Sequence, residues 1–153
     1  MSIATMIGAA TAPTQMIHAK KATYAYRRFG HGAARPLLFL QHFVGTLDNW
    51  DPAVTDPLAT GREVVLLDNA SVGRSTGSVP STVSEMSSHA LDFLDAFGTD
   101  RCDVIGFSLG GMVASLITFP DYGMVVAVTS NISYADTFSI AVKVAEAYAR
   151  QRM

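Results

Sequence analysis

The sequence has little charge of either sign and almost no cysteine. Charged residues make up 16% of its 153 residues, and the formal net charge is −2 at pH 7. Because no basic excess is present, we expect neither nucleic acid nor an anionic membrane surface as a partner. Cys102 is the only cysteine, which excludes an internal disulfide framework and a thiolate metal cluster and favours a reducing, cytoplasmic setting.

Long hydrophobic runs are also missing. Residues 1–15 are small and weakly polar, without the basic stretch or sustained apolar segment that a secretory signal or a membrane-spanning helix requires. We expect these residues to form a flexible tail. The remaining residues, 16–153, are expected to form a single domain, because a chain of this length supports one core more readily than two.

Short apolar runs without polar alternation are typical of strands buried on both faces of a parallel sheet. Residues 36–40 and 63–67 have this character, and the shorter runs 103–105 and 124–128 resemble them. Residues 16–29 alternate in part between apolar and polar side chains, which predicts an antiparallel strand pair at the edge of the sheet.

Helix signals lie between these strands. Asp51 followed by proline predicts an N-cap for a helix over residues 52–58. Thr82 and Glu85 form a Thr-x-x-Glu capping box before apolar residues at helical spacing, and Gly98 ends that pattern. Strands that alternate with helices in this way predict an α/β fold with a mostly parallel sheet and flanking helices.

Residues 103–112 contain the pattern on which the functional interpretation depends. A short apolar strand breaks into Gly-x-Ser-x-Gly and continues as a helix-compatible segment. A serine at the tip of a tight strand-to-helix turn takes a strained backbone conformation, and glycines on either side let the two backbones pass closely. Gly106 and Gly110 occupy those positions, so the pattern predicts a nucleophile elbow with Ser108 at its tip.

The order of three strand-to-loop junctions resembles the α/β-hydrolase family, in particular its esterase, haloperoxidase and perhydrolase branch. The junctions are Gln-His-Phe at 41–43, Asp-Asn-Ala-Ser-Val-Gly-Arg-Ser at 68–75 and the elbow at 106–111, and the resemblance covers residues 24–114. It implies the N-terminal half of an α/β-hydrolase fold. It also implies that Ser108 forms an acyl intermediate, in contrast to the carboxylate chemistry of haloalkane dehalogenases and epoxide hydrolases.

The resemblance further implies an oxyanion hole made of two backbone N–H groups. These groups belong to Leu109, which follows the nucleophile, and to Phe43, in the loop after the first central strand. Each such donor contributes roughly 3 kcal/mol to stabilisation of the transition state. Because the donors are backbone groups, the geometry of the strands matters more than the identity of the side chains.

Two positions depart from the family pattern. His42 stands where the family commonly has glycine, and we name Gln41 and His42 as candidate residues of the substrate pocket. Ser71 stands where the loop after Asp68 usually has glycine, so we expect this turn to need a different backbone conformation.

A serine nucleophile needs a histidine base oriented by a carboxylate, and the family supplies both from loops downstream of the elbow. All four histidines of this chain precede Ser108: His18, His31, His42 and His89. We expect His18 and His31 at the edges of early strands and His89 on the polar side of its helix. His42 is the histidine expected nearest to the pocket.

The downstream residues allow two interpretations. Residues 118–123 are similar to the segment that leads into the catalytic histidine of full-length relatives, in which case Met124 stands in the place of that histidine. Alternatively, residues 124–130 are simply the strand after the elbow helix. The downstream carboxylates are Asp121, Asp136 and Glu146, of which Asp136 also suits the N-cap of a helix over 136–150.

Two functions from different classes remain open. The first is a hydrolase of carboxylic esters or related small acyl substrates that acts through Ser108, with an unusual base or one from a partner chain. The second is a truncated, catalytically impaired homologue that acts as a binding module. Neither needs a metal ion or an organic cofactor. A sheet cut after the elbow strand would expose an apolar edge, so we also expect self-association through that edge.

Overall fold

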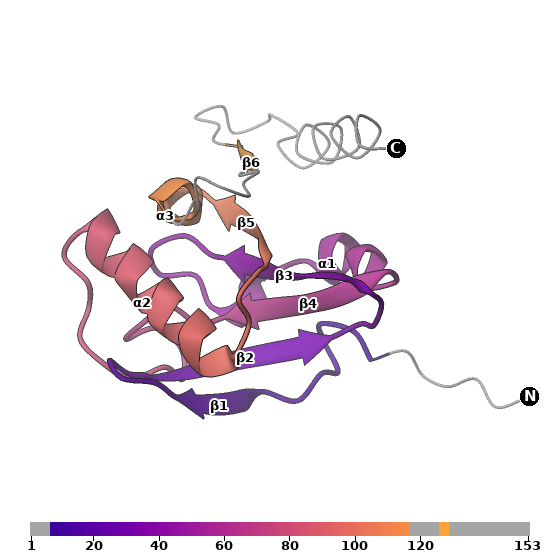
Figure 1. The fold of residues 1–153 in the computed structure, drawn as a ribbon, viewed down its shortest axis with the longest axis horizontal. Coiled ribbons are helices and arrows are strands. Elements are labelled where there is room, and N and C mark those ends of the chain that lie inside the picture. The colour runs from indigo at the N-terminus through magenta and orange to yellow at the C-terminus, as the bar shows by residue number, and fades with distance from the viewer. Residues whose placement is uncertain (1–6, 117–125, 129–153) are drawn as a thin grey trace, which may run out of the picture.

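The computed structural model describes residues 7–116 and 126–128, which form a six-stranded mixed sheet with helices on both faces (Figure 1). The strands are β1 (Gln15–His18), β2 (Thr23–Phe29), β3 (Ala34–Leu40), β4 (Arg62–Leu67), β5 (Asp103–Phe107) and β6 (Val126–Val128). The helices are the 3₁₀ helix η1 (Leu47–Asn49), α1 (Pro52–Leu58), α2 (Val83–Phe97) and α3 (Leu109–Leu116). This architecture confirms the predicted α/β class.

The sheet has the strand order β1-β2-β4-β3-β5-β6. The β3, β4, β5 and β6 strands run parallel, whereas β2 pairs antiparallel with both β1 and β4. The predicted antiparallel pair at residues 16–29 is therefore confirmed, as is the strand expected within residues 124–128. Apolar β3 lies between β4 and β5, and Phe39 pairs with Leu66 on one side and with Ile105 on the other.

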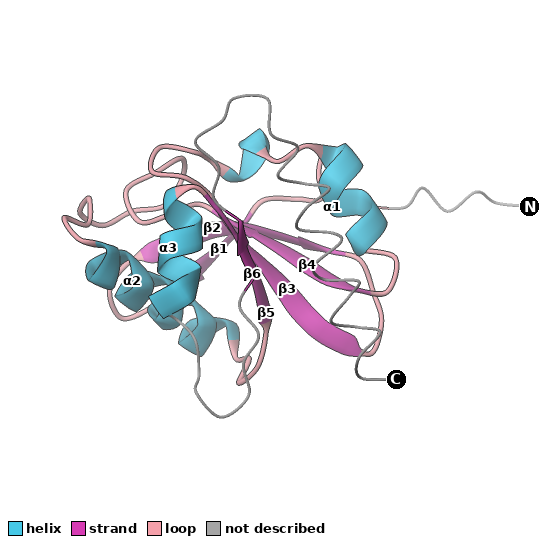
Figure 2. Cartoon of the chain, turned by 90° about the horizontal axis from the view of Figure 1, so that it is seen from above, coloured by secondary structure: helices cyan, strands magenta, loops and turns pink. Residues whose placement is uncertain are grey.

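The two crossovers out of the central strands run in opposite directions. From β3 the chain passes through α1 to β4, and from β4 it passes through α2 back across β3 to β5. Because such connections are right-handed, the two helices must lie on opposite faces of the sheet. Figure 2 shows α1 on one side and α2 with α3 on the other. The direction of the crossovers changes between β3 and β5. In α/β sheets, ligands bind at the carboxyl ends of the strands where this change occurs.

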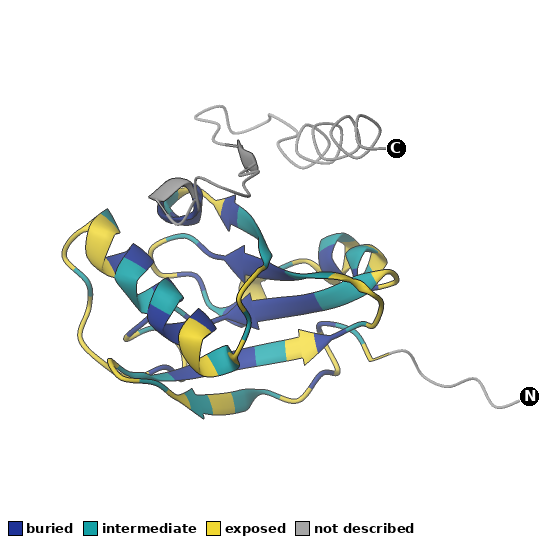
Figure 3. Cartoon of the chain, in the orientation of Figure 1, coloured by how far each residue is buried: buried dark blue, intermediate teal, exposed yellow. Residues whose placement is uncertain are grey.

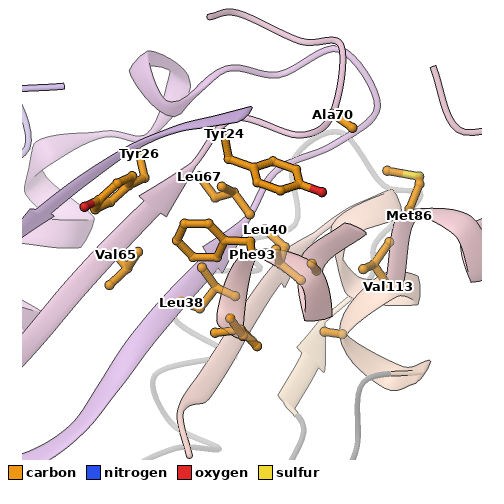
Figure 4. Packing of buried hydrophobic residues seen from close by; sticks show 13 residues of the cluster. Tyr24, Tyr26, Leu38, Leu40, Val65, Leu67, Ala70, Met86, Phe93 and Val113 are labelled. Atoms are coloured by element: carbon orange, nitrogen blue, oxygen red, sulfur yellow. The ribbon is translucent and has the colours of Figure 1, made fainter. Parts of the chain in front are cut away.

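Each face of the sheet carries its own core, and the central strands are buried along most of their length (Figure 3). Beneath α2 and α3, alternate side chains of β2, β3 and β4 surround the fully buried ring of Phe93 (Figure 4). The other face packs Phe29, Leu37, Phe39, Val64 and Leu66 against the region of η1 and α1. This two-sided burial explains why these strands read as continuous apolar runs.

The predicted helix boundaries are confirmed by their caps. The carboxylate of Asp51 accepts from the Ala53 N–H at 2.8 Å, at the start of α1. At the start of α2 the Thr82 hydroxyl accepts from the Glu85 N–H at 3.1 Å, and Gly98 ends the helix with φ of 77°. The reciprocal bond of the capping box goes one residue further back than expected, to the N–H of Ser81.

Part of the expected flexible tail, residues 8–12, is packed against the fold in the described structure. Residues 8–12 form a turn in which the Ala12 N–H donates to the Gly8 carbonyl at 2.8 Å. Ala9 and Ala12 are buried, and the Ala9 N–H donates to Asp56 of α1 at 2.8 Å. The expected helix over 136–150, the carboxylates Asp121, Asp136 and Glu146, and Met124 lie outside the described residues.

The sequence predicted His89 on the polar side of α2, and its half-buried side chain also contacts the core. Its Nδ1 is 2.7 Å from the hydroxyl of the buried Tyr24, which donates in turn to the Asp92 carboxylate at 3.2 Å. Asp92 also accepts from the N–H groups of Lys20 and Lys21, at 3.2 and 2.8 Å. A buried phenol needs such partners, and His89 and Asp92 supply them. The network joins the β1–β2 turn to α2.

No helix within the described ranges is long and apolar enough to cross a membrane.

We predict that replacing Phe93 with alanine lowers the free energy of unfolding by about 3–5 kcal/mol, because it leaves a cavity beneath α2. The Phe93 ring packs against Tyr24, Tyr26 and Phe97 with centroid distances of 6.0, 5.6 and 5.4 Å. Phe43→Ala is the matched control, since that ring is 52% exposed. Urea denaturation of both variants measures the difference, and equal losses would contradict this account of the core.

We predict a pH dependence of stability that passes through His89. Burial, and then the charge of Lys21, lower the pKa of His89 in the folded chain. The folded state therefore favours the neutral ring, so this contribution is complete above the unfolded pKa of about 6.5 and is lost as the pH falls below it. Urea denaturation between pH 7.5 and 5.5 should show a steeper loss for the wild type than for His89→Gln, and parallel curves would refute the assignment.

Candidate functional site

Ser108 lies at the junction of β5 and α3, at the carboxyl end of a central parallel strand. Its φ is 55°, and within the described residues Ser71 is the only other non-glycine residue with positive φ. Such a conformation costs of order 1–3 kcal/mol unless the surroundings hold it. The Ser108 residue is exposed. The geometry is that expected for a serine at the tip of a strand-to-helix turn.

Two glycines make this turn possible. A Cβ atom on Gly106 would lie 2.2 Å from the Gly110 carbonyl oxygen, so β5 and α3 pass too closely for a side chain there. A Cβ on Gly110 would lie 2.1 Å from the carbonyl oxygen of Leu40, the last residue of β3. The start of α3 therefore rests directly on the end of β3, where the loop that contains Phe43 begins.

The loop after β3 is held by its own hydrogen bonds. The buried Gln41 side chain accepts from the His42 N–H at 3.0 Å, and the His42 carbonyl accepts from the Gly45 N–H at 3.1 Å. The half-buried His42 ring packs edge-on against Phe107, with ring centroids 5.8 Å apart. Phe107 directly precedes Ser108, so the structure brings Gln41 and His42 to the elbow.

The two expected oxyanion donors come from these two segments. Phe43 follows His42 in the loop after β3, and Leu109 opens α3 directly after Ser108. Within residues 7–116 and 126–128, neither backbone N–H has a hydrogen-bond acceptor. Unpaired N–H groups beside an exposed serine can receive a developing negative charge.

The loop after β4 is built around a buried carboxylate. Asp68 is 2% exposed and accepts from the Leu47 N–H at 2.7 Å and from the Arg74 N–H at 3.0 Å. A Cβ on Gly73 would lie 2.2 Å from Asp68 Oδ2, which explains a glycine there. Asp68 thus ties the loop after β4 to η1, and through it to the segment that carries Phe43.

Ser71 corrects a prediction. We expected a different backbone conformation where serine replaces glycine, but Ser71 has φ of 63°, in the left-handed region that glycine favours. Its side chain is exposed, and its N–H donates to the Thr76 carbonyl at 3.1 Å. The turn therefore keeps a glycine-like conformation with a serine in it, because the hydrogen bonds around Asp68 and Thr76 fix the backbone.

The other three histidines make no hydrogen bond or ring contact with elbow residues in the described part of the chain. His18 ends β1 and pairs with Thr23 Oγ1 at 2.8 Å, His31 follows β2, and His89 contacts Tyr24. In the described part of the chain, His42 is the one histidine whose ring contacts an elbow residue. Burial and then Asp103 raise the pKa of the Cys102 thiol to about 11, so the reactive thiolate form is scarce at neutral pH.

Large apolar side chains are exposed in the loop after β3 and in the segment 107–112. Phe43, Val44, Phe107 and Met112 are 52%, 66%, 47% and 52% exposed. Phe43 and Val44 belong to the loop after β3, Phe107 precedes Ser108, and Met112 lies in α3; we call these four residues the apolar rim. Among the described residues, no group of three or more His, Cys, Asp or Glu side chains could hold a metal ion.

Sequence reasoning gave no role to Asn69, and it placed Trp50 only in the core or the pocket wall. The Asn69 side-chain amide lies 3.4 Å from the Gln41 carbonyl oxygen and 3.5 Å from that of His42. Trp50 packs between Phe39 and Phe107, with ring centroids 4.8 and 6.4 Å away. Only the position of Asn69, directly after a strand that ends at the same edge as β3, could have indicated this contact.

A mixed α/β sheet with a serine of positive φ in a tight turn between a parallel strand and a helix defines a class of α/β proteins with a strand-turn-helix elbow. A family model described as the alpha/beta hydrolase fold matches residues 35–118. The chain belongs to the α/β-hydrolase family.

An alpha/beta hydrolase fold protein from Chitinophaga pinensis has a similar structure, with a TM-score of 0.69 and 46% sequence identity over 72% of this chain and 40% of that one. The dihydrolipoyllysine-residue acetyltransferase component of the acetoin cleaving system of Cupriavidus necator is 35% identical over 72% of this chain and 30% of its own length. An sn-1-specific diacylglycerol lipase of Danio rerio is 33% identical over 56% of this chain and 27% of its own. The chain thus spans about a third or less of these curated relatives.

We predict that Gly110→Ala lowers the free energy of unfolding by about 1–3 kcal/mol, because the new methyl group meets the Leu40 carbonyl and forces α3 away from β3. Gly61→Ala is the matched control, since a Cβ there has no atom within 4 Å. Thermal denaturation compares the two variants. A Gly110→Ala variant as stable as Gly61→Ala would contradict the close approach of the two backbones.

Proposed function

We propose that this chain is a hydrolase of carboxylic esters or related acyl compounds, with Ser108 as its nucleophile and the N–H groups of Phe43 and Leu109 as its oxyanion hole. The observation that carries the proposal is the exposed Ser108 with φ of 55° beside backbone N–H groups that lack an acceptor in the described residues. The family relationship supports hydrolase chemistry in general. The roles of Ser108, Phe43 and Leu109 and the class of substrate go beyond that relationship and are what we propose.

In the proposed reaction, Ser108 Oγ attacks the acyl carbon and the carbonyl oxygen becomes an oxyanion held by the two N–H groups. The alcohol then leaves with a proton that originates from the serine hydroxyl, and an acyl-enzyme remains. Attack by water on the acyl-enzyme releases the carboxylic acid and restores the serine. Each donor that points at the oxyanion is worth roughly 3 kcal/mol of barrier.

The serine proton requires an acceptor, and His42 is our first candidate for it. Its ring contacts Phe107, the residue before the nucleophile, whereas the other three histidines make their contacts elsewhere in the fold. A histidine of a partner chain is the alternative base. Replacing His42 with glutamine distinguishes these two bases. If His42 is the base, this change should slow the labelling of Ser108 by a serine-reactive probe, and if the partner supplies the base, it should not.

The apolar rim supports an acyl substrate over a strongly charged one. Exposed aromatic and aliphatic side chains around a reactive group favour contact with apolar parts of a ligand. The diacylglycerol lipase among the relatives acts, by its name, on such a compound. Because the chain spans only part of each curated relative, the activity of this chain remains our proposal.

We predict that a fluorophosphonate probe labels the wild-type chain at one residue, and that Ser108→Ala abolishes the labelling. Only an activated serine reacts with such a probe at a useful rate. Ser84→Ala, at an exposed serine of α2, is the matched control and should label like the wild type. Ser108→Ala should also lose hydrolysis of p-nitrophenyl acetate, down to the background rate, whereas Ser84→Ala should hydrolyse it like the wild type.

Labelling that persists in Ser108→Ala would overturn the assignment of the nucleophile. A wild-type chain that neither labels nor hydrolyses the ester would overturn the proposed hydrolase. That second result would favour a binding module that keeps the elbow without turnover, which the absence of a Ser108–histidine hydrogen bond within the described residues would then explain.

A further inference from the structure

We propose that Asn69 is a positioning residue, which sets the direction of the Phe43 N–H and so completes the oxyanion hole from the neighbouring strand. This inference rests on the proposed function for its catalytic consequence. Its structural content, that Asn69 fixes one peptide group, stands apart from catalysis and is tested separately below.

The contact links two segments that are far apart in the sequence. Asn69 follows Asp68 at the carboxyl end of β4, and its side-chain N–H groups face the carbonyl oxygens of Gln41 and His42 at 3.4 and 3.5 Å. Asn69 is half-buried, so water competes less well for these carbonyls than it would on an open loop. One side chain thus spans two successive peptide groups of the loop after β3.

The planarity of the peptide bond turns this contact into a directional constraint. The carbonyl of His42 and the N–H of Phe43 belong to the same trans peptide group, so they point in opposite directions. A donor that holds the carbonyl therefore aims the N–H away from itself. Because Asn69 lies on the β4 side of the loop, the Phe43 N–H is directed away from β4. On the other side of β3 lies β5, with Ser108 at its end.

The remaining bonds of the loop do not replace this one. The Gly45 N–H donates to the same His42 carbonyl at 3.1 Å, and the Gln41 side chain accepts from the His42 N–H at 3.0 Å. Both partners belong to the loop itself and move with it. Asn69 belongs to the loop after β4, which the buried Asp68 holds to Leu47 and Arg74. Asn69 therefore holds the 42–43 peptide group to the sheet, whereas the Asp68–Leu47 bond holds the loop further along, at η1.

Leucine at position 69 is the informative change, because it keeps a similar volume and removes both donors. We expect Asn69→Leu to lower kcat for p-nitrophenyl acetate by about 10- to 100-fold with KM nearly unchanged, since small misplacement of an oxyanion donor acts on the transition state alone. Asn69→Gln keeps a side-chain amide and should recover part of the loss. A loss confined to KM, or equal kcat in Asn69→Leu and wild type, would overturn the catalytic role.

Asn49→Leu is the matched control for general loosening of the loop. The Asn49 side chain accepts from the Thr46 N–H at 2.7 Å in the same loop, but it lies on η1 and makes no contact with the 42–43 peptide group in the described structure. We expect its effect on kcat to be less than about threefold, below the range expected for Asn69→Leu. Equal losses in the two variants would mean that any weakening of this loop suffices, which refutes a specific role for Asn69.

A backbone measurement keeps the proposal testable if the chain shows no turnover. In the wild type, the ¹⁵N order parameter of the Phe43 amide should be near 0.85, the usual value for rigid backbone, and in Asn69→Leu it should fall toward 0.6. Asn49→Leu should leave it high. A Phe43 amide that stays rigid in Asn69→Leu overturns the proposal whatever the activity. Loss of rigidity in a chain without Ser108-dependent turnover would instead refute only the proposed function.

Discussion

The site depends on one steric constraint, the direct contact of α3 with the end of β3. Gly110 brings the first turn of α3 against the Leu40 carbonyl, at a distance where no side chain fits, and Gly106 allows the same between β5 and α3. Glycine gives up conformational freedom on folding, so its use at both positions carries an entropic cost. As a result, the turn with Ser108 at the end of β5 lies next to the start of the loop after β3. If α3 lay further from β3, the backbone N–H groups of Phe43 and Leu109 would also lie further apart.

The chain topology decides where this contact can occur. The strands β3, β4 and β5 are parallel neighbours, so the loops that follow them emerge at one edge of the sheet, where the direction of the crossovers changes. Hydrogen bonds then join these loops in pairs. The Asp68 carboxylate reaches η1, and the Asn69 amide reaches the segment that leads to Phe43. The result is a set of loops positioned by strands, which is the arrangement that precise chemistry requires.

The sequence predicted the features that depend on interactions between residues close together in the chain. The caps at Asp51 and Thr82 lie within a few residues of the groups they satisfy, so α1 and the start of α2 follow from the pattern alone. The elbow is likewise local, since Gly106 and Gly110 flank Ser108 in the sequence. Residues whose roles depend on distant partners were missed or misplaced. The contact of His89 with Tyr24, 65 positions earlier, was not predicted, and Asn69 matters only because β4 lies beside β3.

Locally unfavourable features gather at the carboxyl ends of the central strands. Ser108 and Ser71 both have positive φ, and the apolar rim leaves four large side chains about half exposed or more. The indole N–H of Trp50, which packs against Phe107, is buried without a hydrogen-bond partner in the described structure. Folding alone gives no reason to concentrate these costs in one place, since each could be relieved by a common substitution. Proteins retain such costs where a site needs them, so their clustering around Ser108 favours a ligand there independently of the serine motif.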